Sequence, residues 1–211
     1  YFFKNRYLLE LKNKKLTSVL KALRSINQLI TRINDQDRII REACDVLYQT
    51  NRYGPVWISL VDGNGKHSKI VNAGLMKDIN HLIIHLMEND FFPCCDKILS
   101  KDNLTVYKRR DKKCDDCPYE MDIHENYAVI SLSAENQLFG YLTVSVDNDF
   151  IHEEYEQSLL KELSGDIAFA FKGIFLSQEK EKTEIQLKQT QIVFKTFMDN
   201  LPAGIFILEN N

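Results

Sequence analysis

Apolar residues recur at intervals of three and four along the first fifty positions, which predicts two amphipathic helices. The first helix is expected over residues 8–33. Its predicted apolar face comprises Leu16, Val19, Leu20, Leu23, Ile26, Leu29, Ile30 and Ile33. A second helix is expected after Asn34 and Asp35, because such side chains accept hydrogen bonds from the first backbone N–H groups of a helix. Its apolar face comprises Ile39, Ile40, Ala43 and Leu47, and Tyr53-Gly54-Pro55 ends it. Cys44, beside Ala43 and Leu47, is expected to be a small buried hydrophobe.

Segments rich in β-branched and aromatic residues predict strands in the middle of the chain. Two hairpins are expected, each made of two such segments joined by a short polar turn. A single strand and two further helices are expected between the hairpins. The strands are residues 56–61, 67–74, 104–107, 127–134 and 138–146, and the helices are residues 78–89 and 96–99.

Helical spacing returns from Ile151 to about Phe197. The expected core-facing seam consists of Leu159, Leu163, Ile167, Ala170 and Ile174, and it continues as a thinner stripe through Ile185, Lys188 and Ile192. A long helix that changes in this way is typical of one that leaves its domain and pairs with a second copy. The segment AGIFIL after Pro202 predicts the first strand of a further domain.

Composition and charge exclude several classes of protein. With 44% hydrophobic and 27% charged residues, the chain is expected to fold around a substantial core. The formal net charge of -3 gives no general attraction to nucleic acid or to an anionic membrane. No apolar run approaches the length of about 20 residues that crosses a bilayer. The five cysteines, an odd number without a secretory signal, favour a reducing compartment, so we expect a cytoplasmic protein.

Four of the five cysteines lie between residues 94 and 117, and this cluster is the most specific chemical signal in the chain. Cys114 and Cys117 form a C-x2-C pair that can hold one metal ion from a tight turn, and Cys94 supplies a third thiolate. Candidates for the fourth ligand are Cys95, His124 and the helical pair His81 and His85, and an open position is the remaining alternative. Zinc is the simplest ion for such a set.

Two other interpretations of the thiols stay open. Cations in residues 108–113 would lower the pKa of the Cys114 thiol, which favours a redox dithiol or an iron-based cofactor. Reduced thiols without a function are the third interpretation. Because Asp111, Asp115 and Asp116 interleave with the basic run, we expect a solvated loop that binds no nucleic acid. His67 and His152, at a turn and a helix start, are expected to be solvated.

The order of these elements, with the segments ALRSINQLI, GPVWISLVDGNG and ISLSAENQLFGYLTVSV followed by EEYEQSLLKELSGDIAFAF, resembles a GAF sensory domain. The resemblance covers about residues 21–176. It is similar to the branch of sensor histidine kinases that carries a cysteine before a short helix and a later C-x2-C-P, where Cys94, Cys114, Cys117 and Pro118 stand here. The tail FKTFMDNLPAGIFIL resembles the entry to a PAS domain.

This resemblance implies an α+β fold with an antiparallel sheet flanked by helices and with long helices at both ends. It divides the chain into an incoming linker helix (1–20), a GAF domain (21–176), a coiled-coil signalling helix (177–198) and the start of a PAS domain (199–211). It also implies a ligand pocket on one face of the sheet. The residues expected to line it are Trp57 and Ser59 on one strand and Tyr127, Val129 and Ser131 on another.

The expected function is a sensory and regulatory domain of a sensor histidine kinase, without a catalytic residue of its own. It would respond to a small ligand, metal or redox state and act through paired exit helices in a homodimer. The cyclic-nucleotide motif of some GAF domains is missing around residues 146–150, and no cysteine has the context of a bilin attachment site. The alternatives are a passive relay module with a structural metal and a redox enzyme that reduces oxidised methionine.

Overall fold

A computed structural model describes residues 2–74, 103–108 and 126–200 of the chain. The predicted helices 78–89 and 96–99, the clustered cysteines and the strand after Pro202 lie outside these residues. The described elements are α1 (Phe2–Ile30), α2 (Gln36–Tyr48), β1 (Val56–Val61), β2 (His67–Ala73), β3 (Leu104–Lys108), β4 (Asn126–Ala134), β5 (Gln137–Val146), the 3-10 helix η3 (Asn148–His152) and α4 (Glu154–Asp199). Each helix and strand predicted within the described residues is present.

Both predicted N-terminal helices form. α1 is continuous from Phe2 to Ile30. The carboxylate of Asp35 accepts hydrogen bonds from the backbone N–H groups of Asp37 and Arg38, at 2.9 and 3.2 Å, and so caps α2 as predicted. Leu20 departs from its prediction, because it is 41% exposed while its neighbour Val19 is buried.

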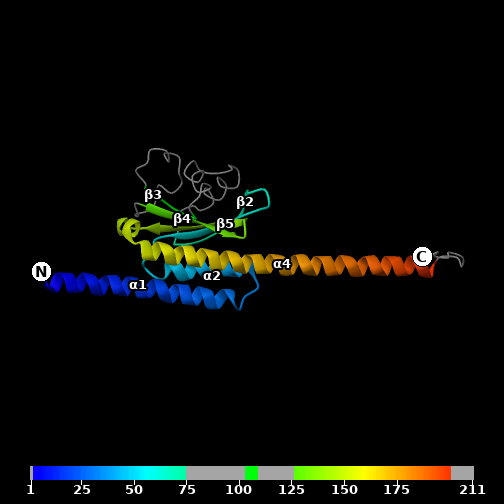
Figure 1. The fold of residues 1–211 in the computed structure, drawn as a ribbon, viewed down its shortest axis with the longest axis horizontal. Coiled ribbons are helices and arrows are strands. Elements are labelled where there is room, and N and C mark those ends of the chain that lie inside the picture. The colour runs from blue at the N-terminus through cyan, green and yellow to red at the C-terminus, as the bar shows by residue number, and fades with distance from the viewer. Residues whose placement is uncertain (1, 75–102, 109–125, 201–211) are drawn as a thin grey trace, which may run out of the picture. The chain divides into compact units, whose positions relative to one another are not determined.

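The strands form one antiparallel sheet in the order β2-β1-β5-β4-β3. β5 lies at the centre and pairs with both β1 and β4, so strands from the two hairpins become neighbours. α1, α2 and the first part of α4 lie on the same side of this sheet (Figure 1). The topology therefore gives the sheet one face covered by helices.

The helix-covered face holds the core. Its strand residues are fully apolar at the buried positions Ile58, Ala128, Ile130, Leu142 and Val144. The apolar face of α4 is wider than the single predicted seam. Leu159, Leu163 and Ile167 are buried as expected, Ala170 is only half-buried, and Leu160, Ala168 and Phe171 also point inward. Phe171 packs edge-on against Phe139, with ring centroids 6.2 Å apart.

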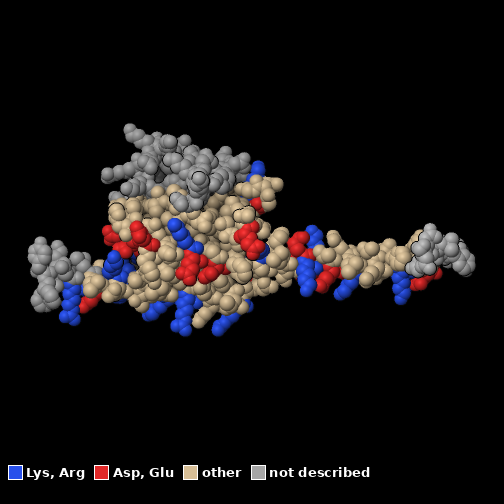
Figure 2. All heavy atoms as spheres, viewed as in Figure 1, with Lys and Arg blue, Asp and Glu red and all other residues tan. Residues whose placement is uncertain are grey.

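A buried ion pair fixes the start of α4. Arg52, in the connector between α2 and β1, binds Glu156 in the first turn of α4 and also pairs with Asp147 at the end of β5. Lys12 and Lys15 of α1 pair with Glu153 and Asp147, at 2.7 and 3.6 Å. Figure 2 shows basic side chains along the helical edge of the domain and acidic side chains between them and the sheet.

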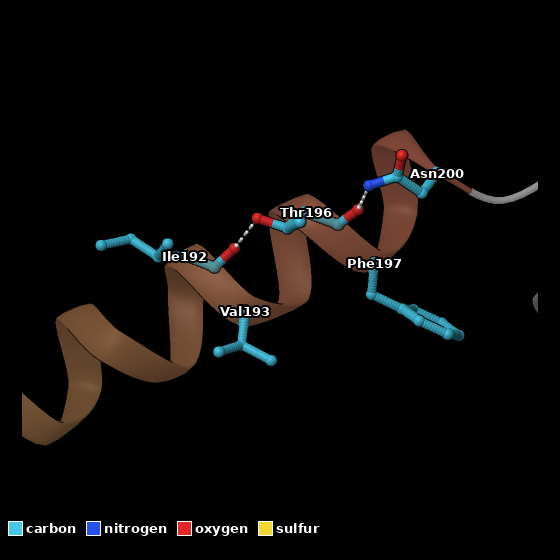
Figure 3. Close-up of a pocket in the computed structure, with 5 residues that line it drawn as sticks. All are labelled: Ile192, Val193, Thr196, Phe197 and Asn200. Carbon is cyan, nitrogen blue, oxygen red and sulfur yellow. Dashed lines mark hydrogen bonds between the residues drawn. The ribbon is translucent and has the colours of Figure 1, made fainter.

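The chain divides into two compact units, Tyr1–Lys172 and Gly173–Asn211. In the second unit, the part of α4 after residue 172 exposes many of its large apolar side chains to solvent. They include Ile185, Leu187, Ile192, Val193, Phe194 and Phe197. Figure 3 shows Ile192, Val193 and Phe197 projecting from the last turns around a shallow, open hollow. Among the described helices, none is long and apolar enough to cross a membrane.

A glycine in the central strand tests this packing. A Cβ added at Gly140 would lie 2.1 Å from the carbonyl oxygen of Ser59 on β1. We expect Gly140→Ala to lower the free energy of unfolding by about 1–3 kcal/mol, because β1 must move away from β5. Gly165→Ala is the control, since nothing lies within 4 Å of that Cβ on α4 and alanine favours a helix. Urea denaturation measures both, and equal stability of the two variants would contradict the close approach.

Candidate functional site

The face of the sheet opposite the core carries the residues predicted to line a pocket. In an antiparallel pair, directly opposite residues share a face, and successive residues alternate between faces. Trp57 and Val129 both lie opposite Thr143 of β5, Ser59 and Ser131 both lie opposite Tyr141, and Tyr127 lies opposite Ser145. All five predicted residues therefore share one face. We call the eight residues Trp57, Ser59, Tyr127, Val129, Ser131, Tyr141, Thr143 and Ser145 the polar face.

Aromatic rings dominate the centre of the polar face. The rings of Trp57 and Tyr127 lie 5.7 Å apart at an angle of 57°, and both side chains are buried. Val129 and Tyr141 form a second apolar contact, against which Val61 and Leu138 pack. Two tilted rings present both a ring face and a ring edge, which suits a flat ligand.

Three members of the polar face were missed by the sequence prediction, and all three belong to β5. Tyr141, Thr143 and Ser145 alternate with Leu142, Val144 and Val146. This alternation was the signal that could have found them. Ser145 is fully buried, and its hydroxyl has no hydrogen-bond partner in the part of the chain that the structure describes. A buried hydroxyl without a partner is costly, so it is a position where a ligand could bind.

The polar face carries hydroxyls and rings but no formal charge. The register places Ile70, Asn72 and Thr105 beside its members, and neither they nor the eight residues are Asp, Glu, Lys or Arg. These strands offer no counter-charge to an ionised group, whose desolvation would be costly. The strands therefore suit an uncharged, hydrogen-bonding part of a ligand.

His67 corrects a prediction of the sequence. It was expected to be solvated, but it is 8% exposed and begins β2, opposite Val61. Its ring centroid lies 6.1 Å from that of Tyr141, at the edge of the polar face. Burial lowers the pKa of His67 below its ordinary value of 6.5.

The predicted metal ligands Cys94, Cys114, Cys117 and His124 lie outside the described residues, as do Cys95, His81 and His85. Among the described residues, no group of three or more side chains could hold a metal ion. Cys44 behaves as the predicted small buried hydrophobe. It is fully buried on α2, and burial raises the pKa of its thiol to about 12.

No protein-family model and no curated protein matches the chain. Solved structures do match its fold. A free methionine-R-sulfoxide reductase from Neisseria meningitidis, in complex with its substrate, has a TM-score of 0.53 at 14% identity and covers 75% of this chain and 91% of its own. The phycoerythrobilin-bound GAF domain of a cyanobacterial phytochrome has a TM-score of 0.52 at 14% identity, covering 76% and 97%.

A third similar structure is the GAF domain of an Acinetobacter phosphoenolpyruvate-protein phosphotransferase, with a TM-score of 0.50 at 12% identity over 74% of this chain and 94% of its own. The chain has the GAF fold. The α+β fold class predicted from the sequence is thereby confirmed. At these identities the likeness concerns the fold, and the function of this GAF fold must be argued from its own residues.

The unpartnered hydroxyl of Ser145 gives a stability prediction. We expect Ser145→Ala to raise the free energy of unfolding by about 1 kcal/mol, because an unsatisfied buried hydroxyl costs about 1–3 kcal/mol. Ser131→Ala, on the same face but only half-buried, should change it less. Urea denaturation at neutral pH measures the free energy of unfolding of both variants and of wild type. A less stable Ser145→Ala variant would show that the hydroxyl is already satisfied within the folded chain.

Burial of His67 predicts a pH dependence. Its pKa is lower in the folded than in the unfolded chain, so the unfolded chain binds more protons between the two values. The stabilisation is complete above pH 6.5 and is lost as the pH falls toward the folded pKa. Between pH 7.5 and 5.5 we expect wild type to lose more stability than His67→Gln. The control His152→Gln alters an exposed side chain and should keep the wild-type loss. Parallel pH profiles for wild type and His67→Gln would refute the assignment.

Proposed function

We propose that this GAF fold is a sensory and regulatory domain of a cytoplasmic sensor histidine kinase. The observation that carries the proposal is the polar face, where buried rings and the unpartnered hydroxyl of Ser145 gather without an intrinsic catalytic pair among the described residues. Such a surface can bind and report a small molecule, but it offers no nucleophile with an adjacent base.

Two of the similar structures hold a small molecule, one a substrate and the other phycoerythrobilin. They support the idea that a GAF fold of this kind accommodates a ligand. For this chain we propose that Trp57, Ser59, Tyr127, Val129 and Ser131 form the floor of the site. The ligand would contribute an uncharged, hydrogen-bonding part to that floor.

The thiols add a second input to the proposal. Cys94, Cys114 and Cys117 with His124 would hold a zinc ion, and an iron-based cofactor or a redox dithiol would use the same thiols. The C-x2-C spacing supports this set. Binding or oxidation there would bias the domain between two states with different affinities for the ligand.

The exposed apolar side chains after residue 172 support a role for the exit helix as the output. We propose that residues 177–198 pair with those of a second copy and lead to PAS and kinase domains in the same chain. A ligand-dependent change in the crossing or register of the paired helices would then set kinase output. A passive relay module with a structural metal would share this architecture without a ligand response.

A second candidate function is the reduction of free oxidised methionine. The similarity of fold to the methionine-R-sulfoxide reductase favours it, together with the thiols at Cys94, Cys114 and Cys117. In that reaction a thiolate attacks the sulfoxide sulfur, methionine is released, and the oxygen stays on the attacking cysteine as a sulfenic acid. A second thiol attacks the sulfenic sulfur to form a disulfide with release of water, and an external thiol reductant converts the disulfide back to two thiols. The long apolar exit helix has no part in such chemistry and favours the sensory function.

Metal analysis distinguishes a zinc-holding domain, whether sensory or passive, from the reductase. We expect the purified chain to bind about one zinc ion and Cys114→Ser to lose most of it, because a three-thiolate site tolerates no missing ligand. Cys44→Ala is the matched control and should keep the metal, since that thiol is buried on α2. A metal-free wild type with freely titrating thiols would contradict the zinc site. Turnover of methionine sulfoxide with dithiothreitol, abolished by Cys114→Ser, would establish the enzyme instead.

A further inference from the structure

The polar face is connected to the exit helix by a short series of contacts through β5. The backbone N–H of Ser145 donates to the carbonyl oxygen of Pro55, and the N–H of Gly54 donates to the carbonyl oxygen of Ser145, both at 2.9 Å. The residue with the unpartnered hydroxyl is thus bonded on its main chain to the connector that follows α2. Arg52 lies in that connector, two residues before Gly54.

Arg52 reaches from the connector to the first turn of α4. Its Nε donates to Oε1 of Glu156 at 2.8 Å, and its Nη2 donates to Oε2 at 2.7 Å. The side chains of Arg52 and Glu156 are only 4% and 8% exposed. A further hydrogen bond, from Nη1, goes to Asp147, which directly follows β5 and lies two residues after Ser145.

Because the Arg52–Glu156 pair is buried, its two charged groups cannot be separated by a small movement at little cost. A buried guanidinium and carboxylate stabilise one another only with good geometry, because each has lost its hydration. If Ser145 moves, Gly54 and Asp147 move with it, and Glu156 must follow Arg52 or leave a buried charge unpaired. The pairs of Lys12 and Lys15 with the same region are more exposed and contribute less.

A second ion pair between the sheet and α4 lacks this property. Lys172 pairs with Glu135 in the turn between β4 and β5, but the Glu135 side chain is 72% exposed. Water can replace that contact at little cost. It therefore serves as a matched control at the opposite end of the same helix segment.

We propose that the buried Arg52–Glu156 pair couples the polar face to the exit helix, with Arg52 as a positioning residue that carries movement at Ser145 into the first turns of α4. The inference rests on the proposed function only in treating the polar face as the ligand site. The coupling itself belongs to the fold and can be measured without a ligand. By linkage it acts equally in both directions.

Amide hydrogen exchange of the full chain tests the coupling. Ser145→Val perturbs the polar face. The readout is the protection of the backbone amides of residues 157–161 in α4. This segment starts at Gln157, whose N–H donates to the carbonyl oxygen of Glu153. We expect Ser145→Val to change the protection factors of these amides about tenfold in the wild-type background, which is within the usual range for coupled sites. In an Arg52→Met/Glu156→Met background the change in protection should fall below about twofold. This background should fold, because apolar replacement of both partners of a buried ion pair is often tolerated.

The control background is Lys172→Met/Glu135→Gln, in which the response to Ser145→Val should stay near tenfold. A full response in the Arg52→Met/Glu156→Met background, or none in wild type, would overturn the proposal. If the double replacement does not fold, Glu156→Gln keeps the shape and removes the charge, and it should also reduce the response. An unchanged response in folded Glu156→Gln would then decide against the pair.

The reverse direction has its own reporter. Trp57 is the single tryptophan of the chain and lies on the polar face. Glu156→Gln should shift its fluorescence emission, whereas Glu135→Gln should not, and a silent Trp57 in folded Glu156→Gln would contradict reciprocity. If the coupling is present but the native preparation holds no small molecule on the polar face, this proposal stands and the proposed sensory function fails. If a ligand binds to the polar face but the coupling is absent, the ligand site stands and this proposal fails.

Discussion

The buried ion pair between a guanidinium and a carboxylate holds the first turn of α4 in place. Arg52 follows α2, Glu156 lies in the first turn of α4, and Asp147 directly follows β5, so one buried ion pair and its third partner join the connector after α2 to a distant part of the chain. Removal of either partner would leave the other charge buried and unpaired, which is strongly destabilising. The position of α4 on the sheet therefore depends on the end of the central strand.

The second constraint is the alternation of side chains across that strand. Leu142 and Val144 lie in the core beneath the helices, whereas Thr143 and Ser145, which alternate with them along β5, lie on the polar face. Because β5 pairs with both β1 and β4, Trp57 and Tyr127 become neighbours although 70 positions separate them in the chain. β5 thus carries three hydroxyl-bearing members of the polar face and leads directly into Asp147, a partner of Arg52.

Local chemistry explains what the sequence could predict. The cap at Asp35, the turn at Glu135 and Asn136, and the alternation in β1 and β4 all act over a few residues, and each left a recognisable pattern. The five predicted polar-face residues could be grouped because each strand separately alternates. The resemblance to GAF domains then indicated that the two strands share a sheet.

What the sequence could not predict depends on contacts between distant segments. His67 looked solvated because its burial against Tyr141 requires β1 to pair with β5 and a register shift between Leu60 and Val61. Arg52 was not among the predicted functional residues, because its partner Glu156 lies 104 positions away. Alternation along β5 could have placed Ser145 on the polar face, but a serine in a strand does not reveal whether its hydroxyl finds a partner.

The central claim is that the polar face is the floor of a sensory ligand site. Native mass spectrometry of the purified full chain, combined with an absorption spectrum, tests it most directly. We expect a bound small molecule in addition to any metal, present in wild type and lost when Trp57→Ala removes the main ring of the floor. A wild-type chain with the same ligand-free mass as a folded Trp57→Ala variant, after correction for the substitution, would contradict it.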